Sequence, residues 1–255
     1  MDRLDARAIA LPGVEVRVVE RCTSTNDLLL AAGDPDVLLA AEEQTAGRGR
    51  RGRRWHAAPG TAVTFSLAKL VHRAPRELPG LALVAGVGAA RALRSLGAAR
   101  TALKWPNDLV LDGAKLGGIL VETRSHASAT LAVIGIGING RRDAAFERRL
   151  RRPVAWLERH IDVDRNRLIL WVAASVLEAL ATFEAHGLEP LRAAWQSMDA
   201  HAGERLRVRL ADGRVLTGVA RGLDEDGALR LQTTRGLRAV RSARVLRARA
   251  RTSCW

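Results

Sequence analysis

An arginine- and glycine-rich segment, called the arginine loop below, spans residues 44–55. Its cations are Arg48, Arg50, Arg51, Arg53 and Arg54, and its glycines are Gly47, Gly49 and Gly52. Glycine lets a backbone turn freely and approach a ligand closely. Because the cations repel one another, we expect a mobile loop that closes when an anion gathers them. Trp55 adds a flat apolar face suited to a heterocycle. From this segment alone, a phosphate-binding loop, a solvated basic loop and a nucleic-acid patch all remain open.

A second cluster of polar residues lies within an apolar hairpin at residues 104–122. Asn107 and Asp108 precede a strand-like run, and Lys115 follows a turn. A lysine here can hold a carboxylate or phosphate as a compact charge. Asp108 could bind Mg²⁺ directly or through water. Gly117 and Gly118 remove side chains beside Lys115, which indicates that another group comes close. The simpler alternative is that Lys115 only pairs with Asp108.

Two further motifs could bind a small ligand. Residues 134–139 alternate isoleucine and glycine and end at Asn139, which predicts a strand with one bare face where a flat ligand could lie. Ser24, Thr25 and Asn26 stand at the start of an expected helix. Their side chains could bond a small polar ligand, but helix capping alone would also explain them.

The pattern of apolar residues predicts the elements that must hold these motifs. Helices are expected over residues 25–32, after Pro75 to about residue 97, and after Asp164 to Gly187. Strands are expected over residues 37–42, 61–69, 103–105, 109–111, 115–123 and 130–138. After about residue 200, short alternating strands separated by Asp-Gly and Arg-Gly turns predict a small barrel.

Composition limits the functional class. The chain has 255 residues, enough for one large domain and one small one. Its net charge of +14 favours anionic partners. With only two cysteines, Cys22 and Cys254, we expect no disulfide framework and the cytoplasm as the compartment. We expect no membrane span and no secretory signal.

Taken together, these motifs resemble those of bacterial biotin–protein ligases, and the resemblance covers roughly residues 20–250. It is carried by the Ser24-Thr25-Asn26 element, residues 47–55, residues 104–108, residues 115–119 and residues 135–139. The glycine-arginine loop and the Lys-Trp-Pro-Asn-Asp element are highly specific in combination. The resemblance also implies the reaction: biotin is activated with ATP to biotinyl-5′-AMP and then transferred to one lysine of a carrier protein.

The resemblance assigns roles position by position. The implied biotin-binding residues are Ser24, Thr25, Asn26, Gln44, Gly47, Arg48, Arg50, Lys115, Gly117 and Gly118. The implied adenylate-binding residues are Arg53, Trp55, Asn107, Asp108 and Asn139, with Asp108 also near the metal. Lys115, Arg48 and Arg50 are the implied catalytic residues. Because Gly140 and Arg141 follow Asn139 where an apolar residue is expected, the adenine loop at about 140–148 is not assigned.

The implied architecture is α+β. A mixed, largely antiparallel sheet with helices, of the class II synthetase type, would form a catalytic domain over residues 1–200. An SH3-like barrel would follow over residues 201–255. Only about 20 residues precede the Ser-Thr-Asn element, so we expect a monofunctional enzyme without a repressor domain and without DNA as a partner.

The implied ligands and partners are ATP, biotin, Mg²⁺ and a biotin carboxyl carrier protein, whose acidity would suit the basic surface. A homodimer paired through sheet edges is also implied. Two rivals remain open. One is a lipoate- or octanoyl-transferring enzyme on the same scaffold. The other is a nucleic-acid-binding module that uses the arginine loop and the barrel.

Overall fold

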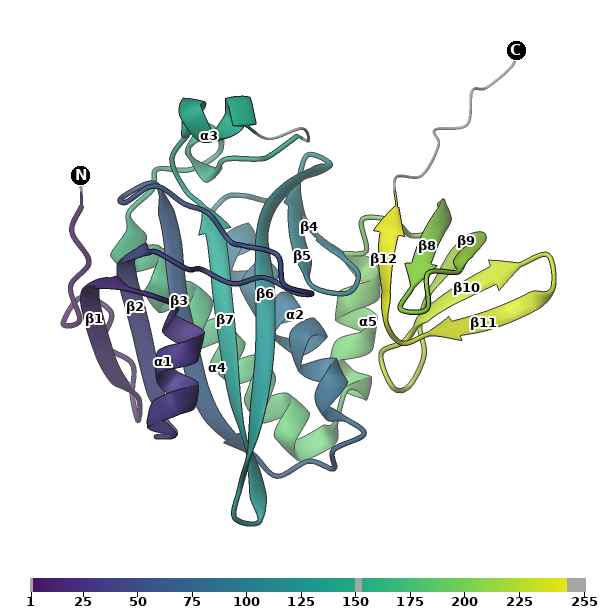
Figure 1. The fold of residues 1–255 in the computed structure, drawn as a ribbon, viewed down its shortest axis with the longest axis horizontal. Helices are drawn as coiled ribbons and strands as arrows, with labels where there is room; N and C mark the ends of the chain where they lie inside the picture. The colour runs from purple at the N-terminus through teal and green to yellow at the C-terminus, as the bar shows by residue number, and fades with distance from the viewer. Residues whose placement is uncertain (1, 150–152, 247–255) are drawn as a thin grey trace.

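A seven-stranded sheet and a five-stranded barrel organise the chain (Figure 1). The computed structural model describes residues 2–149 and 153–246. The large sheet has the order β1-β2-β3-β7-β6-β5-β4, and all neighbours are antiparallel except the parallel pair β1–β2. Its strands are β1 (Glu15–Cys22), β2 (Val37–Gln44), β3 (Ala62–Val71), β4 (Thr101–Lys104), β5 (Asp108–Leu111), β6 (Ala114–His126) and β7 (Ala129–Asn139). The expected mixed, largely antiparallel α+β fold is confirmed.

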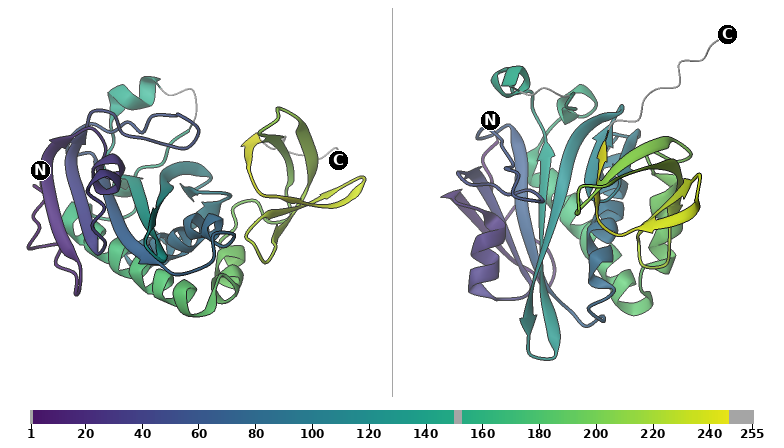
Figure 2. Two further views of the ribbon diagram at one scale, coloured as in Figure 1. Left: turned by 60° about the horizontal axis from the view of Figure 1, so that its bottom comes forward. Right: turned by 45° about the vertical axis from the view of Figure 1, so that its right-hand side comes forward.

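Helices cover the two faces of this sheet unequally. On one face, α2 (Leu81–Ser95) and α4 (Arg165–His186) pack side by side, as Figures 1 and 2 show. On the other face lies only the short α1 (Thr25–Ala32), which contacts β2, β3, β6 and β7. The remaining elements of this part are η1 (Leu78–Gly80), α3 (Ala144–Arg149), η2 (Leu157–Arg159) and α5 (Glu189–Ser197). The part of the second face that α1 leaves uncovered is available for a site.

Strand β7 shows how the sequence separates the two faces. Ile134, Ile136 and Ile138 are buried in the main core beneath α2 and α4. Gly135 and Gly137 therefore point to the face that carries α1, because successive residues of a strand alternate between faces. The face of β7 toward α1 therefore has no side chains at Gly135 and Gly137, as the sequence predicts.

The expected helices begin and end close to the predicted residues. Ser24 caps α1, Gly33 ends it with a left-handed backbone, and Asp164 caps α4. Helix α4 is long and apolar enough to cross a membrane by length and composition, with a mean hydropathy of 1.7. It nevertheless packs on α2, and its apolar residues from Leu168 to Phe183 belong to the main core. This placement is that of a core helix.

The barrel follows the catalytic sheet without a long linker. Its strands are β8 (Arg205–Leu210), β9 (Val215–Leu223), β10 (Leu229–Thr233), β11 (Gly236–Val240) and β12 (Ala243–Leu246), in the order β11-β10-β9-β8-β12. The Trp105 indole Nε1 donates to the Gly227 carbonyl at 3.1 Å. Backbone bonds also join Leu103 to Met198 and to Ala200. The first contact joins the barrel to the segment between β4 and β5, and the backbone bonds join β4 to the segment that leads into the barrel.

Candidate active site

A cavity of about 1340 Å³ lies between the bare face of the sheet, the arginine loop and the barrel. Most of the expected site residues line it: Ser24, Thr25, Asn26, Gln44, Arg48, Arg50, Arg53, Trp55, Asn107, Asp108, Lys115 and Gly118. The barrel contributes Arg205, Val219 and Arg244, which the sequence did not single out. Segments far apart in the chain therefore meet at one site.

The first part of the site is a buried polar cluster at the start of α1. Ser24, Thr25 and Asn26 are each at most 3% exposed. Gln44 Oε1 accepts from the Thr25 backbone N–H at 2.8 Å, and the Thr25 hydroxyl lies 2.7 Å from the Ser66 hydroxyl. Buried polar groups of this kind are stable when they are hydrogen-bonded, and these are already paired. Ser66 was missed because a serine inside an apolar strand resembles an ordinary core position.

Asn26 connects this cluster to the sheet floor. Its Oδ1 accepts from the Ser66 hydroxyl at 2.6 Å, and its Nδ2 donates to Glu122 Oε2 at 3.0 Å. A Cβ placed on Gly135 would lie 2.3 Å from Asn26 Oδ1. Glycine at 135 is therefore required for the Asn26 amide to lie flat on β7.

Replacing Gly135 with alanine tests this close approach. The added methyl must displace the Asn26 amide. If Asn26 binds biotin, as the resemblance implies, the KM for biotin should rise about tenfold or more, because displaced polar contacts cost about 1–3 kcal/mol. Biotin-dependent pyrophosphate exchange measures this KM. Gly80→Ala is the control, since a Cβ there meets only ordinary contacts at 3.7 Å and beyond. An unchanged KM in Gly135→Ala would exclude a role for the Asn26 position in binding biotin.

The two arginines expected to be catalytic have different surroundings. Arg48 pairs with Asp27 and, at 2.7 Å, with Glu122. The hydrogen bond that Arg48 donates to Asp27, followed by the charge of Glu122, raises the pKa of Arg48. Among the described residues, the side chain of Arg50 hydrogen-bonds only to the Asn107 amide oxygen, at 3.3 Å, and makes no ion pair. Burial, and next the charge of Arg51, lowers the pKa of Arg50, although the charge of Asp108 opposes this in part. An anion in the cavity would therefore stabilise the charged form of Arg50.

The arginine loop has contacts of its own that hold it over the cavity. The Gly49 N–H donates to the Arg53 carbonyl at 2.7 Å, and the Trp55 N–H donates to the Gly47 carbonyl at 2.9 Å. At its tip, Arg51 and Gly52 both have positive φ, which closes a tight turn. The Arg51 guanidinium reaches the Ser242 hydroxyl of the barrel at 3.1 Å. The expected mobility of this loop stays a prediction.

Trp55 corrects one expectation about the glycine floor. A Cβ on Gly137 would lie 2.5 Å from Trp55 Cε2, so the indole rests directly on β7. The flat group on this floor is therefore the protein's own tryptophan rather than an open surface for a ligand. Only the remaining faces and edges of the indole can meet a bound heterocycle.

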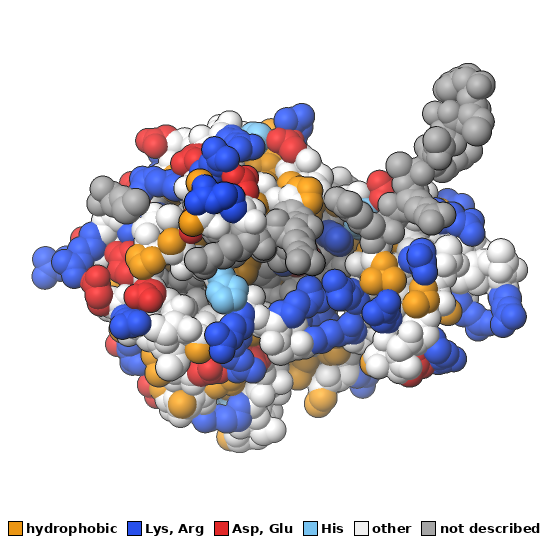
Figure 3. Space-filling view, turned by 45° about the horizontal axis from the view of Figure 1, so that its top comes forward, with side chains coloured by type: hydrophobic (Ala, Val, Ile, Leu, Met, Phe, Trp, Pro, Cys, Tyr) orange, Lys and Arg blue, Asp and Glu red, His pale blue; other side chains and the backbone are white. Residues whose placement is uncertain are grey.

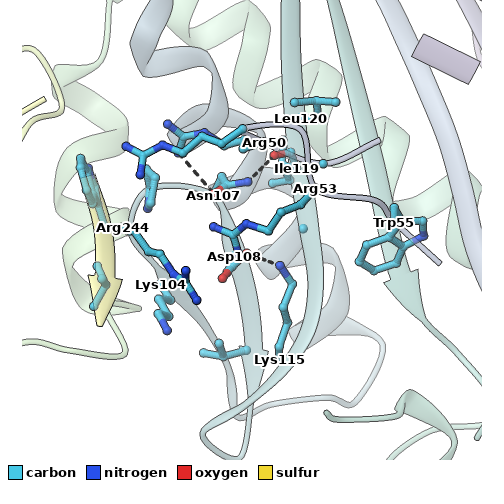
Figure 4. A pocket seen from close by; sticks show the side chains of 18 of the residues that line it. Arg50, Arg53, Trp55, Lys104, Asn107, Asp108, Lys115, Ile119, Leu120 and Arg244 are labelled. Atoms are coloured by element: carbon cyan, nitrogen blue, oxygen red, sulfur yellow. Dashed lines mark hydrogen bonds and ion pairs between the residues drawn. The ribbon is translucent and has the colours of Figure 1, made fainter. Parts of the chain in front are cut away.

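Lys115 and Asp108 form an ion pair inside the cavity, as Figure 4 shows. The side chain of Lys115 is 20% exposed and that of Asp108 is 24% exposed. Gly118 lies opposite Asp108 in the β5–β6 register, and a Cβ there would be 3.3 Å from Lys115 Nζ. The absent side chain therefore leaves room for the ammonium. The simpler reading of Lys115 as a partner of Asp108 is correct for this structure and is compatible with a further role, because the pair faces the cavity.

Three expected site residues do not line the cavity. Asn139 is 4% exposed, and its amide donates to the Lys115 and Ala155 carbonyls at 3.4 and 3.1 Å. Gly117 and Gly47 are needed for close backbone approach, to the Gly137 carbonyl and the Trp55 carbonyl respectively. The expected contact of Asn139 with ribose and adenine stays a prediction. Its role here is to hold the backbone of Lys115, since the Ala155 N–H also donates to the Lys115 carbonyl at 2.9 Å.

Comparison with known proteins identifies the family. Residues 18–139 match the model of the biotin/lipoate A/B protein ligase family, and residues 201–247 match that of the biotin protein ligase C-terminal domain. The biotin–[acetyl-CoA-carboxylase] ligase of Paracoccus denitrificans is 34% identical over 89% of this chain and 98% of its own length. The chain belongs to the biotin protein ligase family.

Two further relatives define its place among the biotin ligases. The bifunctional ligase/repressor BirA of Escherichia coli is 37% identical over 87% of this chain but over only 70% of its own length. A biotin protein ligase from Aquifex aeolicus, solved in complex with biotin and ATP, has 27% identity and a TM-score of 0.77, covering 92% of this chain and 99% of its own. The match therefore leaves about 30% of the length of BirA uncovered.

Proposed function

We propose that this biotin ligase activates biotin with ATP in the cavity between the sheet and the barrel, and transfers it to a lysine of a biotin carboxyl carrier protein. The observation that carries this proposal is one cavity in which Arg50, Arg53, Lys115 and Asp108 meet a buried polar cluster (Figure 4). A polar cluster suits a neutral ureido ring, and the cations suit a carboxylate and a triphosphate.

The first chemical step joins two anions. A carboxylate oxygen of biotin attacks the α-phosphorus of ATP, the bond to the bridging oxygen breaks, and pyrophosphate leaves. Fixed cations aimed at the developing charge stabilise this transition state, because they need no reorganisation during the reaction. Lys115 would hold the reacting carboxylate, and Arg50 and Arg53 would hold phosphate oxygens.

Mg²⁺ fits this site through one carboxylate. Among the described residues there is no group of three His, Cys, Asp or Glu side chains that could hold a metal ion. Mg²⁺ in nucleotide sites is commonly bound by one or two carboxylates together with substrate phosphates, so Asp108 suffices as its protein ligand. Bound there, the ion would neutralise phosphate charge.

In the second step the carrier amine attacks the acyl carbon of biotinyl-5′-AMP, and AMP leaves with the electrons of the broken acyl–phosphate bond. The amine must first lose a proton. The uncompensated charge around Arg50 favours this, because nearby positive charge lowers the pKa of an ammonium. Excluding water from the mixed anhydride is the role we assign to residues 44–57.

This role predicts that ligands protect the arginine loop from protease. Trypsin should cleave after Arg51 or Arg53 in the free protein, and cleavage should slow several-fold only when biotin and ATP are both present, because an anion then gathers the guanidiniums. Timed digestion followed by mass spectrometry measures this. Cleavage after exposed arginines of the barrel, such as Arg235, serves as the internal control. Equal loop cleavage with and without ligands would contradict a closing loop.

Substrate choice separates this proposal from the lipoate-transferring rival. An apo biotin carboxyl carrier domain is incubated with the enzyme, ATP, Mg²⁺ and either biotin, lipoate or octanoate, and its intact mass is then measured. We expect a single biotinyl addition and no lipoyl or octanoyl addition. The relatives named above as biotin ligases support this expectation.

Two assembly proposals follow from the topology. We propose that the catalytic domain spans residues 1–200 and the barrel domain residues 201–255, supported by the match of residues 201–247 to a separate C-terminal family model.

We also propose that two copies of the chain pair through β1. Edge strand β4 is covered by the segment at Met198–Ala200, which bonds to Leu103, whereas no described strand pairs with the outer edge of β1. Free edges are where strands of another chain add.

A further inference from the structure

One face of the barrel carries a row of arginines that the reaction described above does not use. Strand β8 alternates buried Leu206 and Val208 with exposed Arg205, Arg207 and Arg209. Arg244 of β12 lies directly opposite Arg209 in the strand register, so it shares their face. We call these four residues the arginine face.

Among the described residues, no acidic side chain forms an ion pair with the arginine face, and Glu204, next to Arg205 in the sequence, pairs with His201. In the described parts of the chain, none of its four guanidiniums makes a side-chain hydrogen bond or ion pair. The nearby acids Asp212 and Asp226 lie at turns and pair with Arg214 and Arg241 instead. Like charges directly opposite one another destabilise a sheet, so the row weakens the free barrel and would be relieved by an anionic partner.

The arginine face begins at the reaction cavity and leads away from it. Arg205 and Arg244 line the cavity, whereas Arg207 and Arg209 do not. Figure 3 shows Lys and Arg side chains gathered in a band across the junction between the sheet and the barrel. Figure 4 shows Arg244 on the same side of the cavity as Lys104. A protein that inserts a lysine into the cavity would bring the surface around that lysine close to Arg205 and Arg244, where the row begins.

We propose that the arginine face docks an acidic surface of the carrier protein, close to its target lysine. The proposal rests on the proposed function, because it takes the carrier as the second substrate. Arg205 and Arg209 are four residues apart, about 13 Å along a strand, which matches a small cluster of carboxylates. Complementary charge of this kind acts mainly on the rate of encounter and on the choice of partner.

The neighbouring strand favours a protein over a nucleic acid as this partner. In register, β9 places Val215 opposite Arg209, Thr217 opposite Arg207 and Val219 opposite Arg205. Val215 is 39% exposed although apolar. Apolar side chains between the arginines suit the mixed surface of a protein, because nucleic-acid interfaces are more polar and more positively charged.

The test reverses the two arginines that lie outside the cavity. In R207E/R209E, we expect the KM for an apo biotin carboxyl carrier domain to rise about tenfold or more and its dependence on salt to weaken, since rim charges steer association. Pyrophosphate exchange with biotin and ATP, measured without carrier, should stay at the wild-type rate. The matched control R91E/R167E makes the same charge change at exposed positions of α2 and α4 and should leave both quantities unchanged.

A compensating change in the carrier makes the test specific. Replacing acidic residues around the target lysine with lysine should impair the wild-type enzyme and restore activity with R207E/R209E. An unchanged KM in R207E/R209E would overturn the proposal, as would a loss of carrier-free exchange, which would place these residues in adenylation. Salt-sensitive binding of RNA or DNA that R207E/R209E abolishes, with carrier kinetics unaffected, would also overturn it. Failure of wild-type exchange would instead count against the proposed function.

Discussion

Replacing Lys115 with alanine is expected to reduce biotin-dependent pyrophosphate exchange at least about a hundredfold, because removing one preorganised donor to developing charge costs about 3 kcal/mol or more. Lys115 lies on the bare face of the sheet with its ammonium against Asp108 and Gly118. Removal leaves the Asp108 carboxylate without its partner, which adds negative charge where two anionic substrates must meet. Both consequences oppose adenylate formation.

The control for this variant is Lys69→Ala. Lys69 of β3 forms a similar ion pair with Asp36, outside the cavity, and its side chain is 31% exposed. Its loss should change stability by less than about 1 kcal/mol, as for other exposed pairs, and leave exchange unchanged. Far-UV circular dichroism establishes that both variants fold. Exchange at the normal rate in Lys115→Ala would remove this lysine from the chemistry.

The second large effect concerns Arg165, which is 2% exposed at the start of α4. Its guanidinium pairs with Glu42 at 2.6 Å and with Asp2 at 3.3 Å. We expect Arg165→Ala to lower the free energy of unfolding by about 3–5 kcal/mol, because it leaves the largely buried Glu42 carboxylate without an ion-pair partner, whereas Asp2 keeps Arg141. Urea denaturation measures the change. Arg167→Ala, two residues along the same helix and exposed, should fall within about 0.5 kcal/mol of wild type.

The pH dependence of stability gives an independent check on Arg165. Burial raises the pKa of Glu42, but hydrogen bonds from Arg165 and the Leu4 N–H outweigh it, so the pKa of Glu42 is lowered overall; Asp2 is likewise lowered. A carboxyl with a lowered folded-state pKa stabilises the fold above its unfolded pKa and loses that contribution as pH falls through the folded value. Wild type should therefore lose stability below about pH 4.5, near the ordinary pKa of a glutamate carboxyl, more steeply than Arg165→Ala does. Parallel acid profiles would contradict this account of the cluster.

The sequence predicted elements whose signals are local. Ser24 and Gly33 mark both ends of α1, and Asp164 and Gly187 mark those of α4. The Asp112–Gly113 turn between β5 and β6 brings Lys115 back beside Asp108, because both turn residues adopt positive φ. Such signals depend on neighbouring residues only, so they can be read without knowing the fold.

The remaining features depend on contacts between distant segments. Arg48 pairs with Asp27 of α1 and with Glu122 of β6, and no residue within the arginine loop indicates either of these partners. Trp55 rests on Gly137, although its sequence neighbours suggested only an exposed flat face. Strand β1 was missed because it pairs in parallel with β2, and its half-exposed residues give no clean alternation.

The barrel's part in the site was missed for the same reason. Its alternating pattern identifies inward residues such as Leu206 and Val208, but a pattern within one sheet does not show what its outer face meets. The hydrogen bond from Trp105 to Gly227 brings the barrel to the cavity and places Arg244 in its wall. A site formed between two domains can therefore be recognised only when the positions of both domains in the fold are known.

Detection of biotinyl-5′-AMP without any carrier tests the central claim most directly. Purified protein is incubated with biotin, ATP and Mg²⁺, and the small-molecule fraction is analysed by mass spectrometry. We predict that biotinyl-5′-AMP accumulates on the wild-type protein with release of pyrophosphate, and that Lys115→Ala forms none. Absence of the adenylate with the wild-type protein, while ATP and biotin remain unchanged, would contradict the account.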